Sequence, residues 1–383
     1  MGLQVRLAAT DEEREAVFRF RYRVYVDELC LNPREAEHRE KILHDGLDDI
    51  GLSYGLFEDG KVVGSLRILF FEDVDDLDPL IKKYNCKPAL DAFSESAICA
   101  TSRFMLDPNL RGGRVILKLM SAVFRDACKR GARLNFGDCS PHILPFYEHL
   151  GYRRYTRAYN DTSYGYKLPI LMLIRDLERF EQVRSPLLRI AREQDNDQGA
   201  RDWFEKIYPD YLGIESASFV SDEAFFDMLS ACVGQDPLHS VSLFKGMGKD
   251  DVAGILKTAT LIRCHNGDRI INEGERDNTL FVMLKGVAEV FSNGAADRTV
   301  AVLAAGDTFG EIGLVTELAR SANVVAKSDC EVLVISGDFL QRCIQQDPEI
   351  AARLLLNLSC PLAERLSVTT SHVMANATSS LLS

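Results

Sequence analysis

The sequence predicts a two-domain protein of the α+β class, in which an α/β domain precedes a helical connector and a β-roll, also called a double-stranded β-helix. Three observations support this. The chain has 383 residues, 46% of them hydrophobic, which is enough for more than one core. Strand-like and helix-like hydrophobic periods alternate in its first half. From Leu261 the periods shorten to strand length, with Gly- and Asn-containing turns between them.

The N-terminal elements begin with a helix. Thr10 and Glu13 form a capping-box pattern, and apolar residues then follow one helical stripe as far as Leu29. Two strands come next, joined by Asp59-Gly60, a strong signal for a β-hairpin. A third strand is expected from Ala97 to Leu106.

A loop with two glycines follows the third strand and leads into an amphipathic helix that Gly131 ends. The exposed N–H groups and the dipole at the start of a helix attract anions. We therefore expect this loop to bind a phosphate group of an acyl donor. The residues expected there are Arg111, Gly112, Gly113, Arg114 and Val115.

The remaining elements set the expected domain boundaries. A strand at 133–138, a short helix at 143–150 and two closing strands complete the α/β domain. We predict an α/β domain at 1–176, a helical connector at 177–241, the β-roll and its following helix at 242–366, and a flexible Ser/Thr/Ala-rich tail at 367–383.

Composition narrows the classes of function. The formal charge of −12 disfavours general binding of nucleic acid or an anionic membrane, because both need a basic surface. The ten cysteines form no CxxC pair and no His/Cys group at metal-ligand spacing, so we expect reduced thiols and no metal site. The sequence shows no signal-peptide pattern and no apolar run of about 18 residues. We therefore expect a cytoplasmic protein without a membrane span.

A stretch within the β-roll has the chemistry to bind a small anion joined to a sugar. Residues 306–314 read GDTFGEIGL, and 319–322 read ARSA. Glycine lets backbone N–H groups approach phosphate oxygens, arginine supplies a charged fork, and a carboxylate accepts from a ribose hydroxyl. These residues resemble the phosphate-binding cassette of cyclic-nucleotide-binding domains, as in kinase regulatory subunits and the bacterial catabolite activator protein.

The resemblance implies a role for each cassette residue. Glu311 would hold the 2′-hydroxyl, Arg320 the cyclic phosphate, and nearby backbone amides the remaining oxygens. cAMP is the expected ligand, with cGMP as the alternative because Ser321 can bond either the phosphate or a guanine amino group. An ordinary β-roll with a Glu311–Arg320 salt bridge is the other interpretation. The cassette residues are Phe309, Gly310, Glu311, Ile312, Gly313, Arg320, Ser321 and Ala322.

The order of strand, glycine loop and helix resembles the GNAT fold of N-acyltransferases over roughly the first 175 residues. A closer resemblance is to acyl-homoserine-lactone synthases and long-chain N-acyl amino acid synthases, the GNAT relatives that use an acyl carrier protein or acyl-CoA thioester. Arg114 and Ile116 depart from the usual GNAT loop, which argues against acetyl-CoA as the donor. Ala100 replaces a glutamate of the lactone synthases, so we do not expect a homoserine lactone as product.

Five charged residues fall where those families carry charged active-site residues. A solvated ion-pair network is the alternative interpretation of the same charges. The five are Arg21, Asp45, Asp48, Arg67 and Arg103.

Acyl transfer from a thioester needs groups that polarise the carbonyl, accept the amine proton and protonate the thiolate. By the resemblance, Tyr147 is the general acid, although a core tyrosine is the alternative. A nucleophilic Cys139 is a rival idea, but the sequence offers it no activating partner. The bases left open are Glu28, Asp45 and Asp48, and the expected carbonyl-binding amides belong to Phe104, Met105 and Leu106.

Together these features predict a bacterial GNAT-type N-acyltransferase regulated by a cyclic nucleotide. A homodimer through the helix after the β-roll is a further expectation. We do not expect a transcription factor, because the 18 residues after Arg365 contain neither Lys nor Arg for a helix-turn-helix. A cAMP-controlled protein lysine acetyltransferase and a non-catalytic sensor remain as alternatives.

Overall fold

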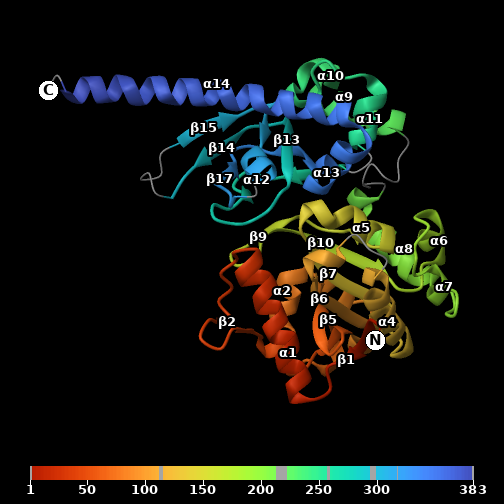
Figure 1. The fold of residues 1–383 in the computed structure, drawn as a ribbon. Coiled ribbons are helices and arrows are strands. Elements are labelled where there is room, and N and C mark those ends of the chain that lie inside the picture. The colour runs from red at the N-terminus through yellow and green to blue at the C-terminus, as the bar shows by residue number, and fades with distance from the viewer. Residues whose placement is uncertain are drawn as a thin grey trace. The chain divides into compact units, whose positions relative to one another are not determined.

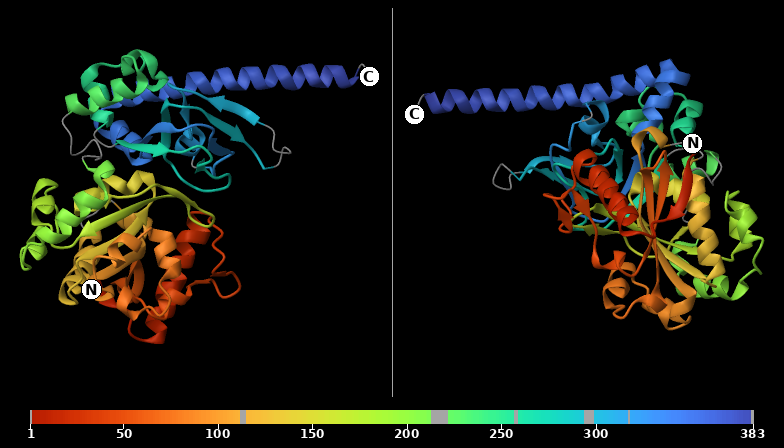
Figure 2. Two further views of the ribbon diagram at one scale, coloured as in Figure 1. Left: turned by 180° about the vertical axis from the view of Figure 1, so that it is seen from behind. Right: turned by 60° about the horizontal axis from the view of Figure 1, so that its bottom comes forward.

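The computed structural model describes residues 2–111, 115–212, 222–256, 259–293, 299–316 and 318–381. They form two compact units (Figures 1 and 2). The first contains the described residues up to 212, and the second those from 222 onward apart from Gly274–Arg276. The predicted two-domain architecture is therefore confirmed.

An eight-stranded mixed sheet forms the centre of the first unit, in the order β1-β4-β5-β6-β7-β10-β8, with β9 paired to β10. Only β6 and β7 run parallel, and every other pair in this sheet is antiparallel. The strands are β1 (Gln4–Leu7), β4 (Leu52–Glu58), β5 (Lys61–Phe70), β6 (Ile98–Leu106), β7 (Leu134–Cys139), β8 (Arg153–Arg154), β9 (Tyr159–Asp161) and β10 (Gly165–Leu173).

Helices pack on the sheet of the first unit (Figure 1). A short hairpin of β2 (Ala36–Glu37) and β3 (Ile42–Leu43) follows the first of them. The helices are α1 (Asp11–Tyr22), α2 (Asp78–Tyr84), α3 (Lys87–Leu90), α4 (Val115–Lys129), α5 (Leu144–Leu150), α6 (Leu177–Gln182), α7 (Leu188–Ala191) and α8 (Gln198–Ile207).

Several local predictions for this unit are confirmed. Thr10 and Glu13 make the reciprocal capping box at the start of α1. Asp59 and Gly60 turn the β4–β5 hairpin with φ of 48° and 82°. The first helix differs from the prediction, since α1 ends at Tyr22 and the chain continues as a π-helix, η1 (Arg23–Glu28).

β6 and β7 diverge after a short parallel pairing. Their ladder covers only Ile98–Ala100 and Leu134–Phe136. Beyond it β6 stays paired with β5, through a β-bulge between Ser65 and Arg67, while β7 stays paired with β10. The later residues of β6 thus have no ladder partner on the β7 side among the described strands.

The core beneath one sheet face combines β7 and β10 with helices far along the chain. Phe136 packs with Tyr84 of α2 and with Phe204 of α8. Residues of α8, within the predicted connector, therefore help to fill the core of the first unit.

The second unit is a β-roll of two four-stranded sheets, in the orders β11-β18-β13-β16 and β12-β17-β14-β15. The strands are β11 (Ala259–Cys264), β12 (Arg269–Ile271), β13 (Leu280–Lys285), β14 (Ala288–Phe291), β15 (Thr299–Leu303), β16 (Thr308–Phe309), β17 (Asn323–Ala326) and β18 (Cys330–Ile335).

Helices precede, interrupt and follow this roll. The last one passes Leu366, where the sequence predicted a flexible tail, because neither Gly nor Pro interrupts the chain between Pro361 and Leu381. The helices are α9 (Asp222–Val233), α10 (Pro237–Ser240), α11 (Lys249–Leu256), α12 (Glu311–Thr316), α13 (Gly337–Gln346) and α14 (Pro348–Leu381). Within the described ranges, no helix combines the length and the apolarity needed to cross a bilayer.

Candidate functional site

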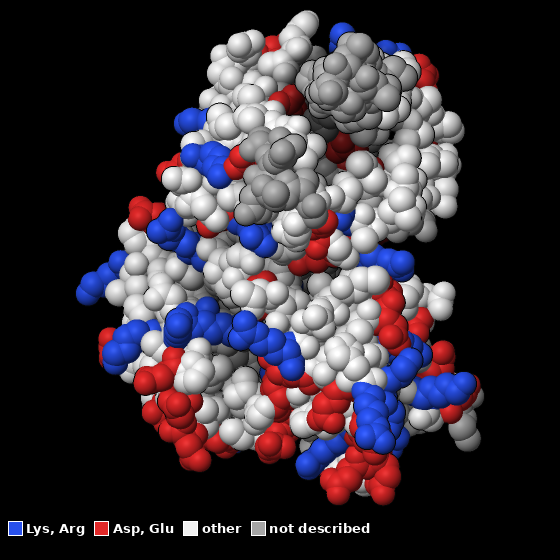
Figure 3. Space-filling model, turned by 90° about the vertical axis from the view of Figure 1, so that its left-hand side faces the viewer, with Lys and Arg blue, Asp and Glu red and all other residues white. Residues whose placement is uncertain are grey.

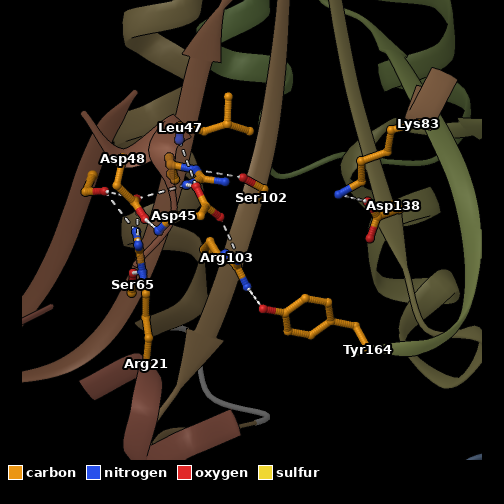
Figure 4. Close-up of polar contacts among 12 residues, drawn as sticks. Arg21, Asp45, Leu47, Asp48, Ser65, Lys83, Ser102, Arg103, Asp138 and Tyr164 are labelled. Atoms are coloured by element: carbon orange, nitrogen blue, oxygen red, sulfur yellow. Dashed lines mark hydrogen bonds and ion pairs between the residues drawn. The ribbon is translucent and has the colours of Figure 1, made fainter. Parts of the chain in front are cut away.

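The structure brings the five predicted charged residues of the first unit together (Figure 4). We call Arg21, Asp45, Asp48, Arg67 and Arg103 the arginine network. They come from α1, from the 3₁₀ turn η2 (Gly46–Asp48) and the residue before it, and from β5 and β6. The network is largely buried, so the alternative of a solvated ion-pair network does not describe it.

Arg21 is fully buried, and each of its guanidinium nitrogens has an acceptor. Nη1 donates to Asp48 Oδ1 at 2.7 Å, Nη2 to Ser53 Oγ at 2.8 Å, and Nε to Ser65 Oγ at 3.1 Å. A buried charge is tolerated only when it is paired and hydrogen-bonded in this way. Arg21 therefore fixes α1 against β4 and β5.

Asp45 joins the other two arginines. Its Oδ1 accepts from Arg67 Nη1 and its Oδ2 from Arg103 Nη2, both at 2.5 Å. Arg103 also donates to the Tyr164 hydroxyl, and its guanidinium lies 4.8 Å from the centroid of that ring. Arg103 stands in the left-handed region at φ 57°, beside the bulge of β6. The network thus holds a strained residue of β6 that lies three residues beyond the end of its ladder with β7.

The two carboxylates are poorly suited to act as bases. Burial would raise the pKa of Asp45, but the guanidinium groups of Arg67 and Arg103 outweigh it and hold the pKa well below its usual value. Arg21 and Arg67 likewise outweigh burial and hold the pKa of Asp48 below its usual value. A carboxylate with a low pKa accepts a proton weakly. Both residues are therefore better explained as partners that position the arginines.

Tyr147 lies in an aromatic group beside the diverging strands. Its ring meets Phe104 of β6 edge-on at 6.3 Å and Tyr152 at 5.3 Å between centroids. Burial, together with nearby Cys139, raises the pKa of the Tyr147 phenol well above its ordinary value, so the phenol keeps its proton. Burial likewise raises the pKa of Cys139, which leaves that thiol un-ionised and argues against a nucleophilic role.

The other predicted residues of the first unit lie around the same strand. Met105 and Leu106 are buried, and Met105 packs in a core with Val17 and Phe57. Glu28 pairs with Arg111 at 2.5 Å. Val115 begins α4, whereas Gly112, Gly113 and Arg114 lie outside the described residues.

Sequence reasoning missed the polar side chains that complete the network. Ser53, Ser65 and Ser102 accept from the arginines, and Tyr164 accepts from Arg103. Strand alternation could have placed Ser53 and Ser65 on inward faces. No local pattern marks Tyr164, since it approaches Arg103 through the fold.

In the second unit the cassette arginine points inward. Arg320 donates to the carbonyl of Gly310 at 2.6 Å, to the carbonyl of Thr279 at 2.7 Å and to Asp277 Oδ2 at 3.0 Å. Its side chain is 3% exposed. The carboxylate that it pairs with is thus Asp277, not Glu311 as in the alternative without a ligand.

The two cassette glycines are required by close packing. A Cβ on Gly310, at φ 83°, would lie 2.7 Å from Arg320 Nη1 and 2.9 Å from the Thr279 carbonyl. A Cβ on Gly313 would lie 2.6 Å from the Asp277 carbonyl. The backbone of the cassette can therefore approach the 277–279 loop only without side chains at these positions.

The remaining cassette residues differ in their burial. Glu311 is buried at the start of α12, and Phe309 stacks on Phe281 at 5.1 Å between centroids. Ile312 and Ala322 are half-buried, and Ser321 is exposed. The role of these residues in binding a cyclic nucleotide stays a prediction.

Two family models match separate parts of the chain. Residues 16–173 match the family "N-acyl amino acid synthase FeeM", and residues 261–347 match the "cyclic nucleotide-binding domain". The chain therefore joins a segment similar to an N-acyl amino acid synthase to a C-terminal cyclic-nucleotide-binding segment.

Two curated relatives match part of the chain. The cAMP-activated global transcriptional regulator CRP of Pasteurella multocida is 36% identical over 121 residues, which are 30% of this chain and 56% of the regulator. Human cGMP-dependent protein kinase 2 is 32% identical over 111 residues, covering 28% of this chain and 15% of the kinase. The chain thus spans little more than half of the bacterial relative.

Solved structures also align with part of the chain. A cyclic nucleotide-binding domain from Methylobacillus flagellatus has a TM-score of 0.35 at 20% identity, covering 40% of this chain and 85% of that domain. The Thermus thermophilus catabolite activator protein has a TM-score of 0.32 at 27% identity, covering 36% of this chain and 63% of that protein.

Proposed function

We propose that the first unit is an N-acyltransferase of the GNAT type that moves an acyl group from a thioester to the amine of an amino acid. The observation that carries the proposal is the divergence of β6 from β7, with Arg103 of the arginine network on β6 and Tyr147 beside the same strand. The match of this segment to N-acyl amino acid synthases supports the choice of acceptor.

The chemistry divides among these groups. The amine nitrogen attacks the thioester carbon and loses a proton, the C–S bond breaks, and the departing thiolate takes a proton. In this proposal the phenol of Tyr147, whose ring meets Phe104 of β6, supplies that proton. Amides of Phe104–Leu106 receive the developing oxyanion. Glu28, whose Oε1 pairs with Arg111 at 2.5 Å, is the base in this proposal.

The donor in this proposal is a long-chain acyl-CoA or acyl carrier protein thioester. Its phosphate would bind at the loop formed by Arg111–Val115, where α4 begins.

The second unit, in this proposal, binds cAMP and regulates the acyl transfer in a cytoplasmic homodimer. Arg320 and Glu311 would bind the cyclic phosphate and the 2′-hydroxyl. cGMP is the competing ligand, because relatives of both kinds align with this segment. Ser321, which is exposed beside Arg320, is the residue through which the affinities for cAMP and cGMP would differ.

Mass spectrometry tests the acyltransferase. Lipid extracts and protein lysines are compared in cells with the gene expressed and silent. We expect N-acyl amino acids to accumulate on expression. New acyl-lysines without such lipids would favour the protein acetyltransferase, and no change in either would favour a non-catalytic sensor.

Calorimetry tests the nucleotide site. We expect the purified chain to bind cAMP, and Arg320→Ala to weaken binding by roughly 10- to 100-fold, because a charge-assisted hydrogen bond contributes ~1.5–3 kcal/mol. Equal affinity of the variant, or equal binding of 5′-AMP, contradicts the pocket.

A further inference from the structure

A second charged cluster lies across the diverging strands from the arginine network. We call Lys83, Asp138, Ser140, Tyr159 and Lys167 the lysine cluster. Figure 4 shows its Lys83–Asp138 pair beside β7, apart from the arginine network on β5 and β6. None of these residues has a role in the reaction described above.

Strand pairing explains why the cluster forms. β10 pairs with β7 from Leu168 onward and with β9 from Gly165 to Lys167. Asp138 lies opposite Pro169, and Tyr159 lies opposite Lys167, so alternation puts all four residues on one face of the sheet. Phe136, two residues before Asp138, packs in the core on that face with Tyr84 of α2. The cluster is therefore the polar end of the face that α2 covers.

The contacts within the cluster leave one positive charge unneutralised. Asp138 Oδ2 accepts from Lys83 Nζ at 3.1 Å and from the Tyr159 hydroxyl at 3.2 Å. Lys167 Nζ contacts the Ser140 hydroxyl at 3.0 Å, and within the described residues no carboxylate lies within ion-pair distance of it. Two ammonium groups thus share one carboxylate, and Lys83 and Lys167 outweigh burial to hold the pKa of Asp138 below its usual value.

The arginine network has the same excess, with three guanidinium groups against two carboxylates. This is unexpected in a chain with a formal charge of −12, whose described surface mixes both signs on the side shown in Figure 3. Burial and Asp138 raise the pKa of the Tyr84 phenol, whereas Lys83 and Arg67 oppose that rise. Each of the two clusters thus has one more basic group than it has carboxylates.

We infer that the lysine cluster binds the carboxylate of the acyl acceptor. This inference rests on the proposed function, and it adds the place where an amino acid is recognised. Tyr147 packs on Tyr152, whose hydroxyl accepts from Asn135 of β7, and strand alternation puts Asn135 on the opposite face from Asp138. The proton donor for the thiolate and the lysine cluster thus lie on opposite faces of β7, so donor and acceptor can meet between the strands.

The assignment explains the components of the cluster. Lys167 has N–H donors left for an anion, and Lys83 is held beside it by Asp138 and is 37% exposed. Two ammonium donors converging on one carboxylate make charge-assisted hydrogen bonds, which are stronger than neutral ones. An amine without a carboxylate would lose these bonds.

The test compares each amino acid with its carboxamide, which keeps the side chain and the amine and removes the charge. Full-length protein is given lauroyl-CoA or lauroyl-loaded acyl carrier protein and the proteinogenic amino acids, and the best acceptor is then compared with its amide. We expect the amide to be poorer in kcat/KM by roughly 10- to 100-fold. An amide as good as the acid overturns the inference and leaves the acyltransferase standing.

Variants assign the effect to the cluster. We expect Lys167→Gln and Lys83→Gln to raise KM for the amino acid by roughly 10-fold or more, with a small change in kcat and none for the amide. Lys82→Gln, an exposed neighbour on α2, is the matched control and keeps the wild-type KM. Equal losses for acid and amide, or a raised KM for the donor alone, contradict an acceptor site. Absence of transfer to any acceptor removes the proposed function and this inference with it.

Discussion

Arg21 shows what the buried charges do for the fold. Its guanidinium donates to three acceptors from three segments, and Asp48 is its ion-pair partner. Removing one partner of a buried pair leaves an uncompensated charge, which costs far more than an exposed pair contributes. Asp48 therefore stabilises the first unit, whatever its effect on chemistry.

The first prediction concerns this pair. We expect Asp48→Asn to lower the free energy of unfolding of the first unit at pH 7 by about 3–5 kcal/mol. Denaturant titration followed by the fluorescence of Trp203 measures it, since this tryptophan packs on Phe93 and Tyr208 in the first unit. Asp49→Asn, an exposed neighbour, is the control.

At low pH, the difference in the free energy of unfolding between wild type and Asp48→Asn should disappear. Arg21 and Arg67 hold the pKa of Asp48 below its usual 3.8 against the effect of burial. Its contribution is therefore complete above that value and is lost as the pH falls through the lower pKa of the folded state. A difference that persists unchanged well below about pH 4 contradicts the assigned ion pair.

Tyr147 carries the second prediction. Tyr147→Phe keeps the ring that packs on Phe104 and Tyr152 but removes the proton source. We expect single-turnover acyl transfer at saturating cAMP to fall by ~10²–10⁴-fold, with donor affinity nearly constant. Tyr152→Phe is the comparison, because the Tyr152 hydroxyl bonds to Thr101 and Asn135 and its loss affects stability. A Tyr147→Phe rate within about twofold of wild type makes Tyr147 a core residue.

Two irregular elements position the site of the first unit. The π-helix η1 lets Tyr25 reach Tyr164, at 5.1 Å between centroids, and lets Glu28 reach Arg111. The bulge of β6 at Arg103 shifts its register against β5, just beyond the end of the β6–β7 ladder at Ala100. Extra residues in regular elements often occur at functional sites because they redirect side chains.

Hydrophobic periodicity predicted the existence of α1, β4, β5, β6 and α4, but neither irregularity. A π-helix keeps nearly the same apolar stripe as an α-helix over six residues. The positions of Tyr25 and Leu29 therefore could not distinguish the π-helix from a continued α-helix. The left-handed Arg103 depends on Asp45 and Tyr164, which approach it through the tertiary fold. In the nucleotide cassette more could be proposed from the sequence, because its glycines, glutamate and arginine lie within the 11 residues from Gly310 to Arg320.

The cassette turn carries the third prediction. Gly310→Ala adds a Cβ that meets Arg320 and the Thr279 carbonyl, in a backbone conformation that disfavours side chains. We expect cAMP affinity to fall by about tenfold or more, since Arg320 must move and a bond to a charged group is lost. Gly267→Ala is the matched control in the same unit, because Gly267 also has a positive φ of 92° but nothing within 4 Å of its Cβ. If both variants lose the same amount of cAMP affinity, the strain of a positive φ explains the loss without the contact with Arg320. If neither variant loses affinity, the prediction is wrong.

At the scale of the whole chain, the alternation of periods predicted two units, while the connector was harder to interpret. Apolar residues of α8 such as Phe204 fill the core of the first unit, whereas α9 and α11 belong to the second. The pattern of an amphipathic helix predicts that one face is buried, but it does not indicate which of the two cores that face packs against. The boundaries predicted for the connector, 177–241, therefore stay a prediction.

Within the second unit, the cassette is joined to the C-terminal helices by apolar packing. Leu314 of α12 lines a small hollow with Phe339 of α13 and Leu354 of α14. A ligand that moves α12 would change this packing, and so bias the helices that leave the β-roll. Such a ligand can shift the protein only by its difference in affinity for two states.

The last prediction is that nucleotide and acyl donor affect each other's binding by the same factor. We expect saturating cAMP to change donor affinity by about 5- to 150-fold, the range of a coupling of ~1–3 kcal/mol. Linkage then requires the donor to change cAMP affinity by an equal factor in the same direction. Calorimetric titration of each ligand, with and without the other, measures both factors on the full chain. Arg320→Ala is the control, since a variant that binds cAMP roughly 10- to 100-fold more weakly should change its donor affinity only at correspondingly higher cAMP concentrations. Factors of one in both titrations contradict coupling at the level of binding, and unequal factors mean that the two titrations do not report the same equilibrium.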